Sequence, residues 1–459
     1  MDMRRLVTSI LAAFCTLCVF AQELKKENYQ LILAQIWRDV SYNFYDPYHL
    51  KEIGWDSLYI EYSKQIPYIK SERDYCRLLC RFLAEVHDGH TELWGAEIVE
   101  QSDTTIDDLP LGVEWIGDKL YISHVLADLE NEIPLNSEIL SINGRTPDDY
   151  YRQYMYPYSS GKTLQNRRNR IQMFTGPKGD SVQFVLNRDG KEYPLHLSYN
   201  LRQNVDKGNW GTKWLNSYPI KDQLSHWKSQ PEKGGFYFLR FDTFGEHLRL
   251  SQVMDNAKAE IEESDYVVLD LRFNRGGNEM TADTLLMYFA DSDTLKTYKS
   301  ITRAHNAFNA AMGYSQESDF RPYYENLHVD TLDEEVFVRC DGIYSIDKPV
   351  FVLIGSKTCS AAEDFLIALK NNNLGRKMIL VGMPTAGTTG APLVRRLSYN
   401  LFYRICTRWP LVPEGMFDNG IQPDYYFEPR IDELTALNGG RILDYVNQLY
   451  HQIFTHKEK

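Results

Sequence analysis

Ser360 lies at a position where a serine could act as a nucleophile. It follows the apolar run 349–354 and opens the helical pattern 360–370. The first backbone N–H groups of a helix have no partner within the helix, and such donors can hold the negatively charged oxygen that forms during acyl transfer. Serine is also among the most favoured residues at a helix N-cap. The segment alone therefore fits either a nucleophile or a structural cap.

Gly276 and Gly277 offer a second group of backbone donors. They belong to the segment 270–278, which leaves another apolar run, 266–271. Paired glycines let the backbone turn tightly and point N–H groups at a ligand, although a structural turn would need the same residues. No Gly-Lys-Ser/Thr follows and no GxGxxG pattern is present, so neither a phosphate-binding P-loop nor a dinucleotide site is indicated.

His90, in the sequence Asp88-Gly89-His90-Thr91, is a candidate general base. Histidine is the usual base near neutral pH, whereas a lone histidine can also be held by local polar contacts in a structural role. A metal site formed with His87 and Glu92 would lack the HExxH spacing of zinc peptidases. We therefore expect no metal and no organic cofactor.

Residues 22–100 are expected to form an N-terminal helical domain that ends at the His90 segment. A capping-box pattern at 71–74 predicts the start of a helix. Apolar residues then recur at helical spacing, namely Tyr75, Leu78, Leu79, Phe82 and Val86. Gly89 fits the end of such a helix.

Residues 105–202 are expected to form a small β module. Short alternating runs replace the helical spacing, and Asn143-Gly144 and Asp189-Gly190 predict tight turns. The stretches 135–145 and 176–182 resemble a PDZ domain. A PDZ domain binds an extended peptide as an added strand at a sheet edge, so the resemblance implies peptide capture. A structural β module without a working groove is the alternative.

Residues 203–459 are expected to form an α/β core. We interpret the polar stretch 203–232 as a linker into it. The apolar runs 266–271, 349–354 and 377–381 are typical of strands buried on both faces. Strands that alternate with helices predict a largely parallel, helix-covered sheet. The long polar stretch 303–335 is interpreted as a lid or substrate loop, because long irregular insertions are uncommon without a function.

The composition restricts the possible partners. Of 459 residues, 43% are hydrophobic and 25% are charged, which is ordinary for globular proteins and predicts about three domains. The formal net charge is −13. A surface of this sign repels phosphate backbones and anionic lipids, so neither nucleic acid nor an anionic membrane is an expected partner.

The N-terminus resembles an export signal. Arg4 and Arg5 precede an apolar stretch at 6–20, and Ala21 offers a small residue before a cleavage point. We expect residues 1–21 to be a signal peptide and the protein to be periplasmic or extracellular. A buried helix or a membrane anchor is the alternative, although the stretch is short for a membrane span. The five cysteines beyond it are odd in number and irregularly spaced, so they do not predict a disulfide framework.

Five short motifs in order resemble the tail-specific (C-terminal-processing) and tricorn-core serine protease family, over roughly residues 75–430. They are Asp88-Gly89-His90-Thr91, Asp270-Leu271-Arg272-x-Asn274-x-Gly276-Gly277, Thr358-Cys359-Ser360-Ala361-Ala362-Glu363, Val381-Gly382-x-x-Thr385-x-Gly387 and Gly420-Ile421-Gln422-Pro423-Asp424. The resemblance implies that Ser360 is the nucleophile. It also implies that the N–H of Ala361, with that of Gly276 or Gly277, forms the oxyanion hole.

One departure decides between two branches of that family. The C-terminal-processing branch uses a Ser–Lys dyad, and its lysine would lie at 383–390, where this chain has none. Lys357 and Lys370 look like surface residues. The tricorn-like branch uses serine and histidine, the histidine being supported by an acidic residue and a hydroxyl, which implies that His90 is the base.

The motifs leave alternatives for the residues that support His90. Gly89 stands where the tricorn-like branch can place a supporting serine, so we expect a shorter relay. The resemblance implies Asp418 as the acidic supporter, with Glu414 as an alternative in the same stretch and Asp88 as a local one.

The sequence thus predicts an exported serine endopeptidase that acts on peptides or unfolded proteins, with possible selection of peptide termini by the PDZ-like module. A non-catalytic protein that binds peptides or apolar ligands on the same fold is the main alternative. An exported scaffolding protein and an esterase for non-peptide substrates are two others.

Overall fold

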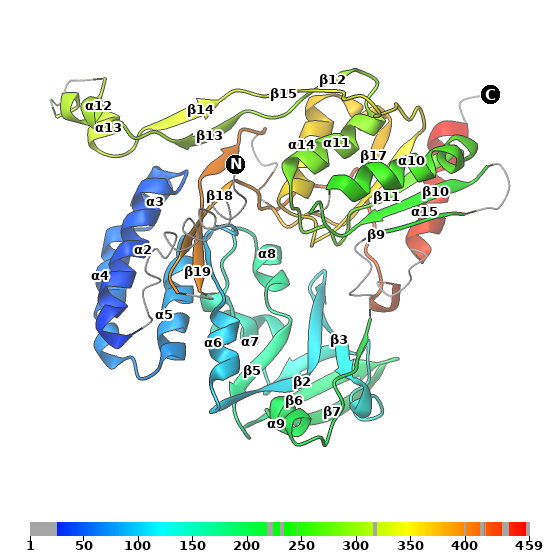
Figure 1. The fold of residues 1–459 in the computed structure, drawn as a ribbon. Helices are drawn as coiled ribbons and strands as arrows, with labels where there is room; N and C mark the ends of the chain where they lie inside the picture. Colours follow the sequence, from blue (N-terminus) through cyan, green and yellow to red (C-terminus); the bar gives the residue numbers. More distant parts are fainter. Residues whose placement is uncertain are drawn as a thin grey trace, which may run out of the picture.

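The computed structural model describes residues 25–217, 224–229, 234–245, 247–314, 319–398, 401–413, 417, 419–433 and 440–455. The expected signal peptide 1–21 and the two acidic candidates Asp418 and Glu414 lie outside these residues. Figure 1 shows three regions: a group of N-terminal helices, a β-rich module below, and an α/β core above them. No helix in the described part of the chain is both long and apolar enough to cross a membrane.

The N-terminal region is helical, as the spacing of its apolar residues predicts. It contains α2 (Tyr29–Asn43), α3 (Pro47–Glu52), α4 (Trp55–Ser63) and α5 (Glu72–Ala84). Ser71 caps α5, because its hydroxyl accepts a hydrogen bond of 3.0 Å from the Asp74 N–H. The inner face of α5 is buried in one apolar cluster with α2 and with strand β19 (Phe402–Cys406). This packing fixes the end of α5, and with it the segment that carries His90.

The β module is a seven-stranded sheet whose described strand pairs are all antiparallel. Its strands are β2 (Ile106–Ile116), β3 (Lys119–Leu126), β4 (Glu138–Ile142), β5 (Met173–Pro177), β6 (Ser181–Arg188), β7 (Lys191–Ser198) and β8 (Trp214–Asn216). They run in the order β5-β2-β3-β4-β6-β7, and β8 pairs with β3. The helices α7 (Pro147–Tyr154), α8 (Leu164–Asn169) and α9 (Leu201–Asp206) accompany them. The β-rich character is confirmed, whereas the PDZ likeness stays a prediction.

The α/β core is built on a six-stranded sheet in the order β21-β17-β16-β11-β10-β9. Its strands are β9 (Leu224–Lys228), β10 (Phe236–Phe241), β11 (Tyr266–Asp270), β16 (Val350–Ile354), β17 (Met378–Gly382) and β21 (Tyr425–Tyr426). All neighbouring pairs are parallel except β9 with β10. The predicted parallel sheet is confirmed. The stretch 203–232 is not a plain linker, because it adds β8 to one sheet and β9 to the other.

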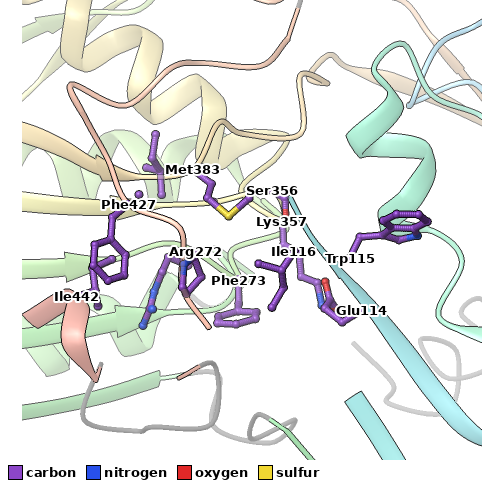
Figure 2. Close-up of a pocket in the computed structure, with 14 residues that line it drawn as sticks. Glu114, Trp115, Ile116, Arg272, Phe273, Ser356, Lys357, Met383, Phe427 and Ile442 are labelled. Atoms are coloured by element: carbon purple, nitrogen blue, oxygen red, sulfur yellow. The ribbon is translucent and has the colours of Figure 1, made fainter. Parts of the chain in front are cut away.

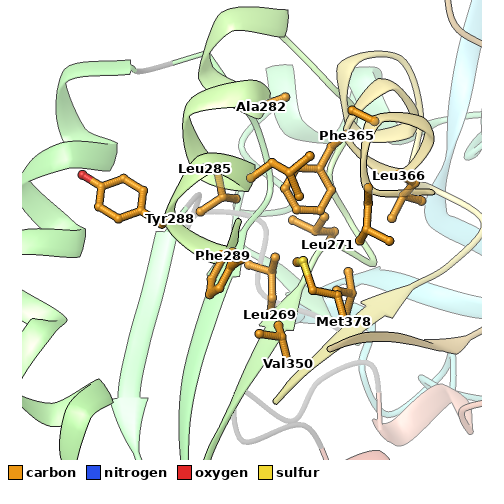
Figure 3. Packing of buried hydrophobic residues seen from close by; sticks show 14 of the residues in the cluster. Leu269, Leu271, Ala282, Leu285, Tyr288, Phe289, Val350, Phe365, Leu366 and Met378 are labelled. Carbon is orange, nitrogen blue, oxygen red and sulfur yellow. The ribbon is translucent and has the colours of Figure 1, made fainter. Parts of the chain in front are cut away.

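Helices cover both faces of the core sheet. On one face, α10 (His247–Glu263), α11 (Glu279–Phe289) and α14 (Ala361–Asn371) share a large apolar cluster with the strands. Figure 3 shows its centre, where Leu285 and Phe365 from two helices meet Leu269 and Val350 from two strands. On the other face, α15 (Arg441–Tyr450) packs on a second cluster. Full burial on both faces explains the continuous apolar runs of these strands.

The described residues of the polar stretch 303–335, namely 303–314 and 319–335, form most of an extended arm. The arm contains β13 (Ser300–Arg303), α12 (Ala307–Met312), α13 (Arg321–Tyr324) and β14 (Val329–Leu332), and β13 pairs with β14. Figure 1 shows it reaching from the core over the N-terminal helices. Asn326 at the arm donates a 3.3 Å hydrogen bond to the backbone of Ser41 in α2. The stretch is therefore structured, and its role as a lid stays a prediction.

A small sheet joins the N-terminal region to the core. It consists of β1 (Glu92–Trp94), β19 and β18 (Pro392–Arg396) in the order β1-β19-β18. Glu92 of β1 lies opposite Arg404 of β19. Because β1 begins two residues after His90, this pairing carries the histidine to the core.

Candidate active site

Ser360 occupies the sharp turn between β16 and α14. Its backbone has φ 57° and ψ −132°, and its hydroxyl makes no capping hydrogen bond to the helix. A non-glycine residue in this region of φ and ψ is strained, and such strain clusters at active sites. The same strand–turn–helix geometry exposes the serine nucleophile of other hydrolases. The structure thus places Ser360 at the N-cap position without using its side chain as a cap.

His90 lies within hydrogen-bond distance of Ser360. Its Nε2 is 3.2 Å from Ser360 Oγ, and its Nδ1 is 2.7 Å from Thr388 Oγ1. The imidazole is buried. If Nδ1 carries the proton and donates to Thr388 Oγ1, Nε2 is free to accept the proton of the serine hydroxyl. A nucleophile in contact with a base that is oriented by a third group is the arrangement of covalent acyl transfer.

Thr388 contacts both partners and was not predicted from the sequence. Besides its side-chain contact with His90, its carbonyl accepts a 2.8 Å hydrogen bond from the Ser360 N–H. Gly89 explains why this hydroxyl comes from residue 388. A Cβ on Gly89 would lie 2.5 Å from Thr388 Oγ1 and 2.6 Å from Asn166 Oδ1. A serine therefore does not fit at position 89, because the Thr388 hydroxyl occupies the space that its side chain would need.

Glu363 holds the backbone of Thr388. This buried carboxyl group accepts 2.8 Å hydrogen bonds from the N–H groups of Gly387 and Thr388, and a short one from the Thr385 hydroxyl. Burial raises the pKa of Glu363 to about 8, although these hydrogen bonds oppose the shift. Asp88, the local candidate for the acidic supporter, accepts a 2.8 Å bond from the backbone N–H of His90. It holds the backbone of this segment, and no described contact joins it to the ring.

The three candidate oxyanion donors differ in availability. The Gly276 N–H already donates to Asn274 Oδ1 at 2.8 Å. The N–H groups of Gly277 and Ala361 have no hydrogen-bond partner within the described ranges. Gly276 is needed for close approach instead, because it has φ +86° and a Cβ there would lie 2.5 Å from the Ser360 Cβ. Gly277 and Ala361 are thus the donors that remain free for a ligand.

The electrostatics of the site favour a neutral base. Burial, and then the positive charges of Arg404 and Arg170, hold the pKa of His90 well below 6.5. Cys359, the neighbour of Ser360, is a different case, because burial raises its pKa to about 12. The Cys359 thiol therefore stays protonated at neutral pH. Because only the thiolate is nucleophilic, Cys359 does not compete with Ser360. Among the described residues, no group of three or more His, Cys, Asp or Glu side chains could hold a metal ion.

Lys357 is not the surface residue that the sequence predicted. It is 5% exposed, and its Nζ lies 2.6 Å from Oε2 of Glu114 in β2. Figure 2 shows the two side chains at the junction of β2 and the loop before Ser360. Burial lowers the pKa of Lys357, against the attraction of Glu114. The sequence reasoning was wrong because lysine is rarely buried unless it is paired, and this partner is 243 residues away. Lys370 is exposed, as expected.

Ser360 and His90 open onto a groove of about 910 Å³. Its walls come from all three regions: the end of α5 and β1, the segment around α8, and the core loops after β11 and β16. A groove of this size can hold an extended peptide.

Two family models match this chain. Residues 237–427 match peptidase family S41, and residues 25–84 match the tricorn protease C1 domain. Among solved structures, mature CPAF is similar with a TM-score of 0.67 and 14% identity, over 95% of this chain and 99% of that one.

Two further solved structures are also matched. Mature CPAF complexed with lactacystin has a TM-score of 0.66 and 13% identity, over 94% and 99% of the two chains. The photosystem II D1 C-terminal processing protease has a TM-score of 0.44 and 16% identity, over 87% and 93%. The likeness to CPAF concerns the whole fold.

Proposed function

We propose that this chain, a serine-type peptidase whose residues 237–427 match peptidase family S41, cleaves peptide bonds through an acyl-enzyme on Ser360 with His90 as the general base. The observation that carries the proposal is the 3.2 Å contact between His90 Nε2 and Ser360 Oγ, with Nδ1 of the same ring on Thr388. The absence of lysine from 383–390 supports histidine rather than lysine as the base.

In the proposed mechanism, His90 Nε2 takes the hydroxyl proton as Ser360 Oγ attacks the peptide carbonyl. The N–H groups of Gly277 and Ala361 hold the oxygen as it becomes negative. Loss of one such donor typically costs about 10²–10³-fold in rate. His90 then protonates the leaving amine, and the acyl-enzyme is hydrolysed by a water that His90 activates. Thr388 keeps the ring in the tautomer that this sequence of steps requires.

The β module is proposed to present peptides to this site. Support comes from β2, whose pairing with β5 covers 106–108 and Gly112 and is followed on that side by a 2.8 Å bond from the Val113 N–H to the Gln172 carbonyl. No described strand pairs with β2 on this side after that bond. The end of β2 therefore has β3 as its strand partner on one side, and an extended peptide could pair along the other. Capture of a peptide terminus at this edge would explain how an endopeptidase selects chain ends.

Export is proposed on the sequence of residues 1–21 alone, with its basic start, apolar stretch and Ala21. N-terminal sequencing of the protein recovered from the periplasm or the medium tests it. A first residue at Gln22 supports the proposal, and an intact Met1 contradicts it.

Labelling with a fluorophosphonate serine probe tests the proposed nucleophile and base. We expect one adduct, located on Ser360 by peptide mass spectrometry, that is lost in Ser360→Ala and strongly slowed in His90→Ala. Circular dichroism of both variants controls for folding. A folded protein that forms no adduct and cleaves no peptide would favour the non-catalytic binding protein.

A further inference from the structure

The groove beside Ser360 is positively charged although the chain carries a net charge of −13. Among the described residues that line it, five are cationic and two are carboxylates. The cations are Arg77, Arg170, Arg275, Lys357 and Arg404, and the carboxylates are Glu92 and Glu100. A cleft lined by one sign of charge concentrates ligands of the other sign.

Most of these cations already have a carboxylate partner. Arg77 lies 3.6 Å from Glu100, and Lys357 pairs with Glu114. Arg170 and Arg404 both contact Glu92, and the buried Asp88 provides a further negative charge near them. These groups are therefore largely compensated within the protein.

Arg275 is the exception. Its side chain is exposed, and within the described ranges it makes no ion pair and no hydrogen bond. Only its backbone is tied down, since its N–H donates to the Asp242 carbonyl at 3.3 Å. Its charge also reaches into the site, because Arg275 contributes to the lowered pKa values of Arg170 and Lys357 after the larger effect of burial.

Arg275 also starts close to the reacting atoms. The next residue, Gly276, is so near the nucleophile that a Cβ on it would touch the Ser360 Cβ and the Ala361 N–H. Consecutive Cα atoms are about 3.8 Å apart, so the Arg275 side chain leaves the backbone two residues before Gly277, one of the two free oxyanion donors. In a bound extended peptide, which advances about 3.3 Å per residue, it would meet positions next to the scissile bond.

We propose that Arg275 is a specificity residue that binds a carboxylate of the substrate within about two residues of the scissile bond. Guanidinium binds carboxylate through two parallel hydrogen bonds, which gives both strength and orientation. The carboxylate can be an acidic side chain or a free peptide C-terminus. This inference rests on the proposed function, since it concerns the substrate of the Ser360 site.

Matched quenched fluorescent peptides test the inference. One carries Asp or Glu near the scissile bond with an amidated C-terminus, a second carries Asn or Gln instead, and a third is the neutral sequence ending two residues after that bond in a free carboxylate. We expect kcat/KM to be at least about 10-fold higher for a carboxylate peptide than for the neutral one, as for a charged hydrogen bond. A preference for the first peptide over the second assigns the side chain, and a preference for the third peptide over the second assigns the C-terminus.

The variants make the test specific to Arg275. In Arg275→Gln the ratio of kcat/KM for the preferred carboxylate peptide to kcat/KM for the neutral peptide should fall to near one. Arg275→Lys should restore part of this ratio. Arg376→Gln is the matched control, since Arg376 is exposed and lies just before β17, outside the groove. A ratio that is unchanged in Arg275→Gln, or a wild-type ratio near one, overturns the inference.

The inference and the proposed function can fail separately. A fluorophosphonate probe carries no carboxylate, so labelling of Ser360 without any carboxylate preference would leave the nucleophile in place and remove the role of Arg275. If no peptide is cleaved, the same peptides can be titrated against Ser360→Ala with and without Arg275→Gln. A ratio of Kd values that Arg275→Gln does not change then overturns the inference independently of turnover.

Discussion

At the scale of single residues, Thr388 is the side chain on which the proposed base depends. It contacts the His90 ring through its hydroxyl, Ser360 through its carbonyl and Glu363 through its N–H. Three contacts of this kind hold the nucleophile and the base at a fixed separation, and a fixed separation lowers the entropy cost of the reaction.

Replacement of Thr388 by valine should lower kcat/KM by about 10- to 100-fold, less than the ~10⁴-fold loss on removing the ring-orienting carboxylate of a Ser-His-Asp triad. Valine keeps the shape and the backbone contacts but gives His90 Nδ1 no acceptor. Thr388→Ser keeps the hydroxyl and should recover most of the rate. Steady-state kinetics over a range of pH checks this. Equal losses in Thr388→Val and Thr388→Ser would mean that the methyl group, not the hydroxyl, matters.

The acidic limb of the pH–activity profile should lie below pH 6.5. His90 must be neutral to accept the proton, and burial together with Arg404 and Arg170 lowers its pKa well below 6.5. Activity should therefore persist as the pH falls past 6.5 and be lost only when the pH reaches the lowered pKa. The profile of kcat/KM for the free enzyme measures this directly. A midpoint at or above 6.5 would show that water or negative charge stabilises the protonated ring enough to offset burial and the two arginines.

Ser360 and His90 could be predicted because short motifs mark them, whereas Thr388 could not. It is one of several hydroxyl residues in 385–389, and only the lack of space at Gly89 shows why a threonine from this loop must reach the ring. Lys357 was misjudged for a similar reason, because its partner Glu114 is distant in the sequence. Local patterns give the type of residue, but pairing over hundreds of residues depends on the fold.

At the scale of elements, the buried parallel strands were the easiest to predict. β11, β16 and β17 are continuous apolar runs because both of their faces are covered. β8 and β9 were missed because they are short and form no continuous apolar run, although Trp214, Leu215 and Trp227 pack against apolar clusters. The arm formed by 300–332 was also missed, because its short paired strands expose polar and apolar residues alike.

The pairing of β1 with β19 holds the segment of His90 against the core. At this pairing Glu92 carries the negative charge that Arg170 and Arg404 share. Glu92→Gln would leave Arg170 and Arg404, with side chains 25% and 13% exposed, without their shared carboxylate. Removing one partner from a buried ion pair costs about 3–5 kcal/mol. We expect a loss in the free energy of unfolding near the lower end of that range, and slower labelling of Ser360.

Urea denaturation measures the change, and Glu138→Gln is the matched control. The partner of Glu138, Lys119, is 57% exposed, and such a surface pair contributes about 1 kcal/mol or less. If Glu92→Gln is no more destabilising than Glu138→Gln, the two arginines do not depend on Glu92.

At the scale of the whole molecule, the candidate site exists only where three regions meet. His90 comes from the N-terminal region, Ser360 and Thr388 from the core, and Asn166 beside Gly89 from the β module. The order of these regions could be predicted from motifs. Their relative placement could not, because it depends on contacts such as that between Thr163 Oγ1 and the Ala386 carbonyl, which are 223 residues apart.

The Lys357–Glu114 pair should act as a mechanical link between the β module and the nucleophile loop. Lys357 lies three residues before Ser360, and Glu114 lies on β2, the strand whose free edge is proposed to receive peptide. Both side chains are 5% exposed, so either single change removes an ion-pair partner from a buried charge. Glu114→Leu and Lys357→Met should therefore each lower the free energy of unfolding by about 3–5 kcal/mol.

The double variant should lose much less than the sum of the two single losses, because replacing both charges by apolar groups of similar size removes the cost of burying them. Urea denaturation of the four proteins gives this coupling energy, and Lys377→Met controls for the loss of a lysine, since its partner Asp291 is 70% exposed. The rate of Ser360 labelling in the double variant, with and without added peptide, then tests whether the pair transmits peptide binding from the β module to the nucleophile, separately from its effect on stability. If the folded double variant labels normally but its labelling rate no longer changes with peptide, the pair links the β module to the nucleophile. If the losses in the free energy of unfolding are additive, the two charges act independently.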